Sequence, residues 1–491
     1  MYGKDPSIGL HNAFSSGLGR KKLVIEFSSP NIVSELESKH VRSTILGACI
    51  ANLYENMGWD VVRINYLGDW GMQMGLLGVG WEKFGSEEEF HADPVRHMFS
   101  IYSKIDKVFQ SEVVARKVAS EDGLEPHYSF ETQGLFAERN TFFKRIQDGD
   151  EEVLALWKRF RDVAIEHYSK LYARLNISFD EYSGESQVSL ESMGEVEEML
   201  KRKGISEESN GSWIVDLQKH RVKGGGIVTI RSRNQKRTYL LRDLAAVLDR
   251  SRRYSFDRMI YVVADDHYEH FRRLFYILEL LNMHDVAHKL EHVRFNKGRQ
   301  MGHENTSGDI FDQCLNSMHE SLVANPDKAA LLHDSEYPVA DLGISALVAQ
   351  ELSVKRGTDY HFDFLKMALF EGATGPNLQY WYSRLCSMLK ATSFDLSIFS
   401  DEDFTCVEEE FELLRVLALY PSITSSAYQF LDPSIVLHYL VQITGQLSFC
   451  IENNKSLEEP IATPARAALF ESTRQVLENG MKLLGIMPSH G

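Results

Sequence analysis

One stretch near the start of the chain limits the fold more than any other, because it joins a strand, a tight loop and a helix. Leu23-Val-Ile-Glu-Phe27 is a short apolar run, typical of a strand buried in a parallel sheet. Ser28-Ser-Pro-Asn31 supplies turn residues, and apolar residues then recur at helical spacing from Val41 to Leu53. Ligands bind beyond the carboxyl ends of such strands, and the next helix N-terminus favours anions. The stretch therefore predicts an α/β protein with a ligand cleft.

Length and charge limit the class of protein. At 491 residues the chain is too long for one compact core, so two or three domains are expected. Its hydrophobic content of 43% is a globular value. The net charge of -17 argues against a protein that grips nucleic acid over its whole surface, so we expect no DNA partner. A local basic patch, and with it contact with tRNA, stays open.

Cysteine usage and hydropathy indicate the compartment. The five cysteines are scattered without CxxC spacing, which suits a reducing compartment and offers no zinc site or other metal site. No apolar run approaches the roughly 20 residues of a membrane span. Residues 1–6 carry neither an apolar signal segment nor an arginine-rich transit pattern. We predict a cytoplasmic protein with no membrane partner.

The remaining patterns divide the chain. Val61–Asn65 and Met259–Ala264 read as further buried strands, and Asp265-Asp-His267 follows the second of them at its carboxyl end. Beyond about residue 345 only helical spacing remains. The expected parts are a tail at 1–22, an α/β domain at 23–344 with a mostly helical, acidic insertion at about 80–220, and a helical domain at 345–491.

The opening stretch also resembles a known signature. Glu26-Phe-Ser-Ser-Pro-Asn31, running into His40, is similar to the strand end and HIGH motif of arginyl-tRNA synthetases, which belong to class I. The resemblance continues through Val62–Gly71, Tyr239–Asp243, Phe370–Pro376 and Arg474–Gly485, in order over nearly the whole chain. It implies a Rossmann-like parallel sheet with a helical insertion, followed by an all-helical domain like those that bind the anticodon.

The resemblance implies an arginine pocket. Carried over position by position, Glu26, Tyr239 and Asp243 would hold the guanidinium group, and Asn31 the amino end. Carboxylates in a fixed geometry suit a planar cation with five donors. A simpler reading stays open, in which Glu26 and Asp243 pair with neighbouring arginines such as Arg42 or Arg242. One position departs from the family, which tends to have Gln where this chain has His267.

Both ATP motifs of the family are altered here. The four HIGH positions read Glu37-Ser-Lys-His40, which puts a carboxylate where phosphates should lie and a lysine where bare backbone is needed. In the second motif Glu304 and Asn305 replace two cations, although Lys297 or Arg299 could compensate. A like charge beside a phosphate costs on the order of 1 kcal/mol or more. The sequence therefore predicts that arginine-dependent exchange of pyrophosphate into ATP is lost.

A chain that keeps the arginine pocket but has lost both ATP motifs resembles the fungal arginine-containing cyclodipeptide synthases. On that resemblance we predict an aminoacyltransferase of secondary metabolism that takes arginine from arginyl-tRNA and joins it to a second amino acid. The pair would cyclise to a diketopiperazine, with a second aminoacyl-tRNA as partner and no cofactor, because arginyl-tRNA is already activated. Two alternatives stay open: a non-catalytic tRNA-binding or arginine-sensing relative, and an active arginyl-tRNA synthetase with unusual motifs.

Roles follow for the remaining polar residues. His40 and His267 are the expected acid–base groups, because histidine titrates nearest neutral pH. Ser29, or its neighbour Ser28, could accept the acyl group, although the family uses this serine pair for substrate packing. The densest basic run could contact tRNA phosphates or could simply be solvated surface; its tRNA-binding candidates are Arg231, Arg233, Lys236 and Arg237. The second amino acid and the oligomeric state stay open.

Overall fold

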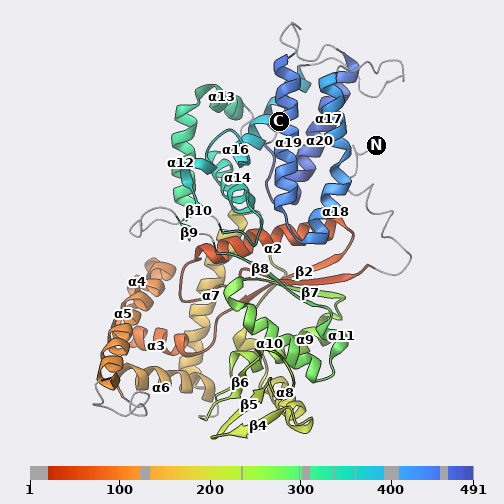
Figure 1. Ribbon diagram of the computed structural model, residues 1–491. Coiled ribbons are helices and arrows are strands. Elements are labelled where there is room, and N and C mark those ends of the chain that lie inside the picture. Colours follow the sequence, from red (N-terminus) through yellow and green to blue (C-terminus); the bar gives the residue numbers. More distant parts are fainter. Residues whose placement is uncertain are drawn as a thin grey trace.

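The computed structural model shows a parallel sheet across the middle of the molecule, with a helical part on one side (Figure 1). The residues that it describes are 20–121, 133–233, 236–297, 299–300, 310–334, 338–359, 361–391, 408–453 and 463–489. Two sequence-based interpretations lie outside them: most of the tail at 1–22, and the loop that carries Glu304 and Asn305.

The sheet contains five parallel strands in the order β3-β2-β1-β7-β8. Strand β1 is central, and its residues Leu23, Val24 and Ile25 are completely buried, which explains why this strand reads as a continuous apolar run. The strand bounds are β1 Lys22–Glu26, β2 Asp60–Leu67, β3 Glu181–Gly184, β7 Arg258–Ala264 and β8 Leu290–Phe295.

Helices cover both faces of this sheet. Leu23 and Ile25 point into the core that contains α2 (Ser38–Asn56), whereas Val24 points into the core that contains α9 (Tyr239–Tyr254) and α10 (Tyr268–Leu280). The alternation follows from the two-residue period of a strand. Figure 1 shows α2 on the face toward the helical part and α9 and α10 on the opposite face. Strand β1 and helix α2 are thereby fixed on either side of the loop 27–37.

The segment between β2 and α9 is mostly helical, but it also contains strands. One of them, β3, completes the edge of the main sheet, and three others form a small antiparallel sheet in the order β4-β5-β6. The elements are α3 Met72–Phe84, α4 Glu87–Ala92, α5 Pro94–Glu121, α6 Gly134–Asp148, α7 Glu151–Arg174, α8 Leu190–Arg202, β4 Ser206–Ser209, β5 Ser212–Asp216 and β6 Ile227–Arg231.

Beyond β8 the described chain is helical apart from one short pair of strands. That pair is β9 (Arg299–Gln300) with β10 (His361–Phe362). The helices after α11 (His284–Ala287) are α12 Ile310–Ala324, α13 Pro326–Asp334, α14 Val339–Leu352, α15 Phe364–Met367, α16 Gly375–Lys390, α17 Glu408–Ala418, α18 Tyr420–Phe430, α19 Ser434–Asn453 and α20 Pro464–Leu483. The predicted fold class is confirmed: a Rossmann-like parallel sheet with a largely helical insertion, followed by a helical domain.

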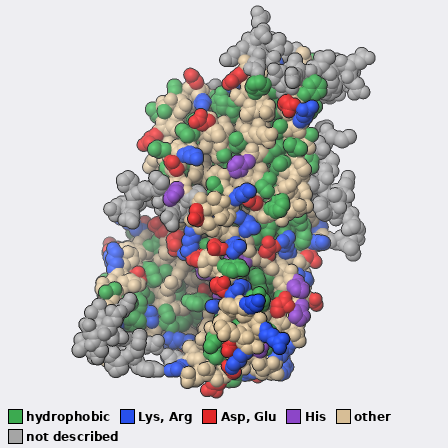
Figure 2. Space-filling model, viewed as in Figure 1, with side chains coloured by type: hydrophobic (Ala, Val, Ile, Leu, Met, Phe, Trp, Pro, Cys, Tyr) green, Lys and Arg blue, Asp and Glu red, His purple; other side chains and the backbone are tan. Residues whose placement is uncertain are grey.

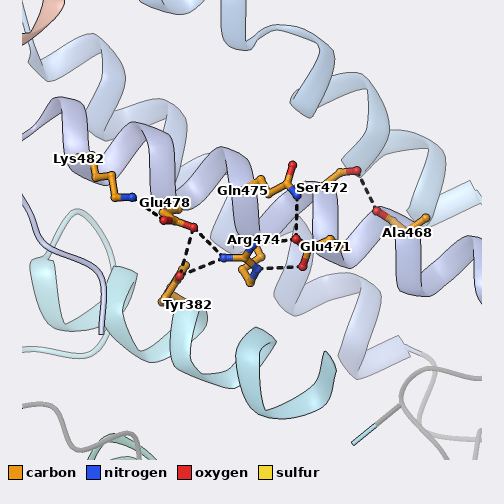
Figure 3. A network of polar contacts seen from close by, with 8 residues as sticks. All are labelled: Tyr382, Ala468, Glu471, Ser472, Arg474, Gln475, Glu478 and Lys482. Atoms are coloured by element: carbon orange, nitrogen blue, oxygen red, sulfur yellow. Dashed lines mark hydrogen bonds and ion pairs between the residues drawn. The ribbon is translucent and has the colours of Figure 1, made fainter. Parts of the chain in front are cut away.

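A polar network joins α20 to α16 (Figure 3). Arg474 donates to both carboxylate oxygens of Glu471, at 2.7 and 2.9 Å, and to Glu478 at 2.7 Å. It also donates to the hydroxyl of Tyr382 on α16 at 3.1 Å. Bidentate arginine–carboxylate pairs fix geometry as well as charge. The Arg474–Gly485 block therefore serves to hold two helices of the bundle in place.

Helix α19 is unusually apolar. Its stretch Ser434–Glu452 has a mean hydropathy of 1.4 and is long and apolar enough to cross a membrane, a run that the sequence analysis did not recognise. Within the bundle, however, Leu437, Leu440 and Ile443 are completely buried. The helix packs against α17, α18 and α20, so its apolarity fits a place in the bundle core.

Candidate functional site

A cavity of about 700 Å³ lies at the carboxyl ends of β1, β2 and β7. This is the edge where parallel α/β sheets bind ligands. The cavity collects every residue that the sequence assigned to arginine binding or catalysis: Glu26, Ser29, Asn31, His40, Tyr239, Asp243 and His267. The four residues assigned to tRNA binding do not line it.

The loop after β1 is held in an uncommon conformation. Ser28 and Ser29 both have positive φ, 69° and 48°, which costs non-glycine residues on the order of 1–3 kcal/mol each. The backbone N–H of Ser28 donates to Ser43 on α2 at 2.9 Å, and the Ser28 hydroxyl lies 2.7 Å from that of Tyr172 on α7. Among the described residues the enclosed Ser29 hydroxyl has no hydrogen-bond partner. The loop thus presents an unsatisfied polar group to the cavity.

Glu26 does not face the cavity as a free carboxylate. Its Oε2 lies 2.5 Å from Nη1 of Arg250 on α9, and both side chains are buried. Burial raises the pKa of Glu26, and the neighbouring Arg250 guanidinium opposes that rise. The sequence left open that Glu26 pairs with an arginine of this chain, and the structure shows such a pair with Arg250 rather than with Arg42 or Arg242.

Asp243 lies at the cavity wall and is shared with a histidine. Its Oδ2 lies 2.7 Å from Nε2 of His270 on α10. Both side chains are partly exposed, at 27% and 28%, so a ligand can reach the carboxylate. Tyr239, one turn before Asp243 on α9, also lines the cavity and is 60% exposed. Asp243 is therefore the more accessible of the two carboxylates that the sequence assigned to arginine binding.

A further carboxylate, Glu185, was missed by the sequence analysis. It follows β3, with its Oε2 enclosed and without a hydrogen-bond partner among the described residues. Burial, and then repulsion from Asp243, raise the pKa of Glu185 to about 8. Its neighbour Ser186 donates from its N–H and hydroxyl to Asp69, at 2.9 and 2.7 Å, which fixes this turn. Glu185 and Asp243 thus repel each other at one end of the cavity, and a bound cation would relieve that repulsion.

The signals that could have revealed Glu185 and His270 are weak. Glu185 comes after a four-residue strand inside a segment that reads as helical, so nothing marked it as a strand end. His270, in the first turn of α10, follows the N-cap residue His267 by three residues, a spacing that puts two side chains on the same side of a helix. Spacing alone could have paired the two histidines, but not Asp243 with either.

The opposite end of the cavity carries histidines and lysines. His40 is buried, and its Nδ1 accepts a hydrogen bond from the Glu37 N–H at 3.2 Å. Burial, and then the positive charge of Lys39, lower the pKa of His40 to about 4. Burial also lowers the pKa of His267. His40 is thus uncharged at neutral pH, and positive charge at this end must come from other groups.

Two lysines supply that charge. Lys39 Nζ lies 3.0 Å from Oε2 of Glu37, and their side chains are 31% and 56% exposed. Lys297 pairs with Asp266, and its charge also depresses the pKa of both His40 and His267. The sequence analysis treated Glu37 as a carboxylate that repels the phosphates, whereas the structure pairs this carboxylate with Lys39.

The predicted tRNA-binding run is partly neutralised. Arg231 and Arg237 both lie beside Glu197 on α8, at 3.7 and 3.3 Å. Figure 2 shows positive and negative side chains intermingled over the face of the molecule that it presents. Contact of Arg231, Arg233, Lys236 and Arg237 with tRNA stays a prediction.

Comparison with known proteins assigns two regions of the chain. Residues 11–364 match the family described as tRNA synthetases class I (R), catalytic domain, and residues 378–490 match the DALR anticodon binding domain. The cytoplasmic arginine–tRNA ligase of Saccharomyces cerevisiae is 42% identical over 480 residues, which are 95% of this chain and 76% of that protein. The probable cytoplasmic ligase of Schizosaccharomyces pombe is 38% identical over 96% of this chain and 77% of that protein.

Solved structures agree on the fold. The arginyl-tRNA synthetase of Plasmodium falciparum has a TM-score of 0.76 at 21% identity, covering 96% of this chain and 78% of that one. The enzyme of Thermus thermophilus has a TM-score of 0.74 at 17% identity, covering 98% of this chain and 85% of that one.

These relatives overturn the prediction of a cyclodipeptide synthase. Proteins 34% to 42% identical over 95% to 98% of this chain are named arginine–tRNA ligases, so the diketopiperazine product, the second aminoacyl-tRNA and the secondary-metabolic role are wrong. The predicted independence from ATP fails as well, because that class of ligase uses ATP. Its physical basis was weak: the charge of Glu37 is offset by Lys39.

Proposed function

Because the chain belongs to the class I arginyl-tRNA synthetase family, we propose that it is an arginine–tRNA ligase, which esterifies tRNA with arginine at the expense of ATP. The observation that carries this proposal is the pair of crowded carboxylates, Glu185 and Asp243, at one end of the cavity. They lie in a chain that is 42% identical to a named arginine–tRNA ligase. Their chemistry fits the one amino-acid side chain that is a permanent planar cation.

In this proposal the guanidinium group of arginine binds at the end of the cavity that carries Glu185 and Asp243, which we call the acidic end. Asp243 accepts from one edge of the group, Glu185 from another, and Tyr239 offers its ring and hydroxyl at the rim. Asn31, on the loop after β1, faces the amino end. Glu26 acts indirectly: its ion pair with Arg250 anchors α9, the helix that carries Tyr239 and Asp243.

ATP occupies the other end of the same cavity. It supplies the activation that a free carboxylate needs before it can form an ester. The residues there fit a polyphosphate in charge, because Lys39 lines the cavity and Lys297 lies close enough to influence both histidines. His40 and His267 are uncharged donors or acceptors in this arrangement, rather than phosphate-neutralising cations.

The carrier of arginine is tRNA, held by both parts of the chain. The helical domain matches the DALR anticodon binding domain, which is why we assign it the anticodon end. Arg231, Arg233, Lys236 and Arg237 are our candidates for contacts nearer the acceptor end. The named relatives include both cytoplasmic and mitochondrial ligases, and we propose a cytoplasmic location for this chain.

The test is direct aminoacylation. The full chain is incubated with tRNA, labelled arginine and Mg·ATP, and label in acid-insoluble tRNA is counted. We expect arginylation that requires ATP and is absent when lysine replaces arginine. No label above background, under conditions in which the yeast relative charges the same tRNA, would overturn the proposal.

A further inference from the structure

The two ends of the cavity differ in how firmly their charges are held. At the acidic end, the Glu26–Arg250 pair is buried on both sides. At the other end, the Glu37–Lys39 pair is half open to solvent, with 56% of Glu37 and 31% of Lys39 exposed. Exposed pairs contribute little free energy, so a stronger ligand for either partner can replace the other.

Lys39 is placed to make such an exchange. It lines the cavity on the second residue of α2, between Glu37 and His40. The neighbouring His40 is neutral. An anion at the N-terminal end of α2 would therefore be met by the positive charge of Lys39, whose effect on His40 exceeds that of Lys297. The ammonium group now rests 3.0 Å from one carboxylate oxygen of Glu37.

We propose that Lys39 exchanges Glu37 for a phosphate of the nucleotide, so that Glu37 competes with ATP for the same ammonium group. This inference rests on the function proposed above, because it assumes that the cavity admits ATP. In this proposal Glu37 lowers the affinity for the nucleotide, and Lys39 binds one of its phosphates. Charge-assisted hydrogen bonds to phosphate are strong, and Lys297, which pairs with the half-exposed Asp266, offers a second positive charge to the same anion.

The competition predicts opposite effects for the two partners. Replacing Glu37 by Gln leaves Lys39 unpaired and removes a negative charge, so ATP should bind about fivefold more tightly. Replacing Lys39 by Met removes the phosphate ligand, so ATP should bind roughly tenfold or more weakly. If Glu37 acts through Lys39, the benefit of Glu37→Gln should largely disappear when Lys39 is already Met.

The experiment is calorimetric titration of Mg·ATP into the full chain and into Glu37→Gln, Lys39→Met and the double variant. Lys170→Met and Glu166→Gln are matched controls, because they break an exposed lysine–carboxylate pair on α7, at 2.7 Å, outside the cavity. These controls should bind ATP as the unaltered chain does. Arginine is titrated separately, and the arginine affinity of all variants should be unchanged.

Three results would overturn the exchange. They are unaltered ATP affinity in Lys39→Met, weaker binding in Glu37→Gln, or the same tightening by Glu37→Gln with and without Lys39, which would make Glu37 a mere repulsive charge. Aminoacylation separates this failure from failure of the proposed function. A chain that arginylates tRNA with ATP but shows any of these results keeps its function and loses the exchange.

Discussion

The acidic end and the lysine end of the cavity illustrate two ways of placing charge in one site. At the acidic end, Arg250 neutralises the buried Glu26, while burial, and then repulsion from Asp243, raise the pKa of Glu185 to about 8. At the lysine end, Lys39 pairs directly with Glu37 at the solvent-exposed edge, and burial, followed by the charge of Lys39, keeps His40 neutral.

This difference matters for recognition. Two neighbouring, partly buried carboxylates repel each other until a cation binds between them, so this end favours a guanidinium group over an uncharged side chain. An exposed pair costs little to break and discriminates weakly. We infer that amino-acid specificity resides at the acidic end and that the lysine end tunes affinity. The following predictions test the contrast, from the largest expected effect to the smallest.

Breaking the buried pair should have the largest effect. Arg250→Met leaves the Glu26 carboxylate buried without its partner, which typically destabilises a protein by about 3–5 kcal/mol. Chemical denaturation would measure the loss. Arg252→Met is the matched control on the same helix, because its pair with Glu195 is largely exposed, and it should change stability little. Equal losses in both variants would remove the distinction between the two kinds of pair.

Removing a carboxylate from the acidic end should weaken arginine binding without unfolding the chain. Asp243→Asn should cost about 2–5 kcal/mol of arginine affinity, which is roughly 30-fold or more, because a charged partner of the guanidinium group is lost. Titration calorimetry with arginine would show it. Asp249→Asn serves as control, because Asp249 lies on the same helix but bonds to Ser192 at 2.6 Å, outside the cavity. Unchanged affinity in Asp243→Asn would place the guanidinium group elsewhere.

Arginine binding should depend on pH through Glu185. Its pKa is raised to about 8 in the free protein, and a bound guanidinium group lowers it, so binding expels a proton. Affinity should therefore increase with pH, by at most about tenfold per unit, and level off above about pH 8. Titrations between pH 6 and 8.5 would record this slope. Glu185→Gln should flatten it, and a slope that persists in that variant would assign the proton to another group.

The smallest effect should come from the exposed pair. Lys39→Met should change the free energy of unfolding by only about 0–1 kcal/mol, because the Glu37–Lys39 pair is half open to solvent. The same denaturation series as for Arg250 provides the comparison. A loss as large as that of Arg250→Met would show that the lysine end is structural and cannot exchange ligands freely.

Local sequence patterns predicted much of this site. The run Leu23–Phe27 and the turn after it placed the central strand and the cavity loop, and Met259–Ala264 lies within β7 as observed. The resemblance to arginyl-tRNA synthetases then selected Asn31, Tyr239 and Asp243, which the fold does bring to one cavity. These features depend on neighbours in the chain or on a shared family pattern, which a sequence displays.

The rest depends on contacts between distant residues. Nothing in the sequence indicates that Glu26 pairs with Arg250, because only the packing of α9 against β1 brings them together. Glu185 was missed because β3 is too short to show a period. The mistaken loss of ATP use came from judging Glu37 and Lys39 one at a time, whereas their effect on a phosphate depends on their pairing.

The most direct test of the account is exchange of labelled pyrophosphate into ATP by the full chain, in the presence of tRNA. The exchange requires arginine to be bound at the acidic end while ATP is bound at the lysine end. We predict exchange that depends on arginine, is lost in Asp243→Asn and is reduced in Lys39→Met. Absence of arginine-dependent exchange in the unaltered chain would contradict the claim that this cavity activates arginine with ATP.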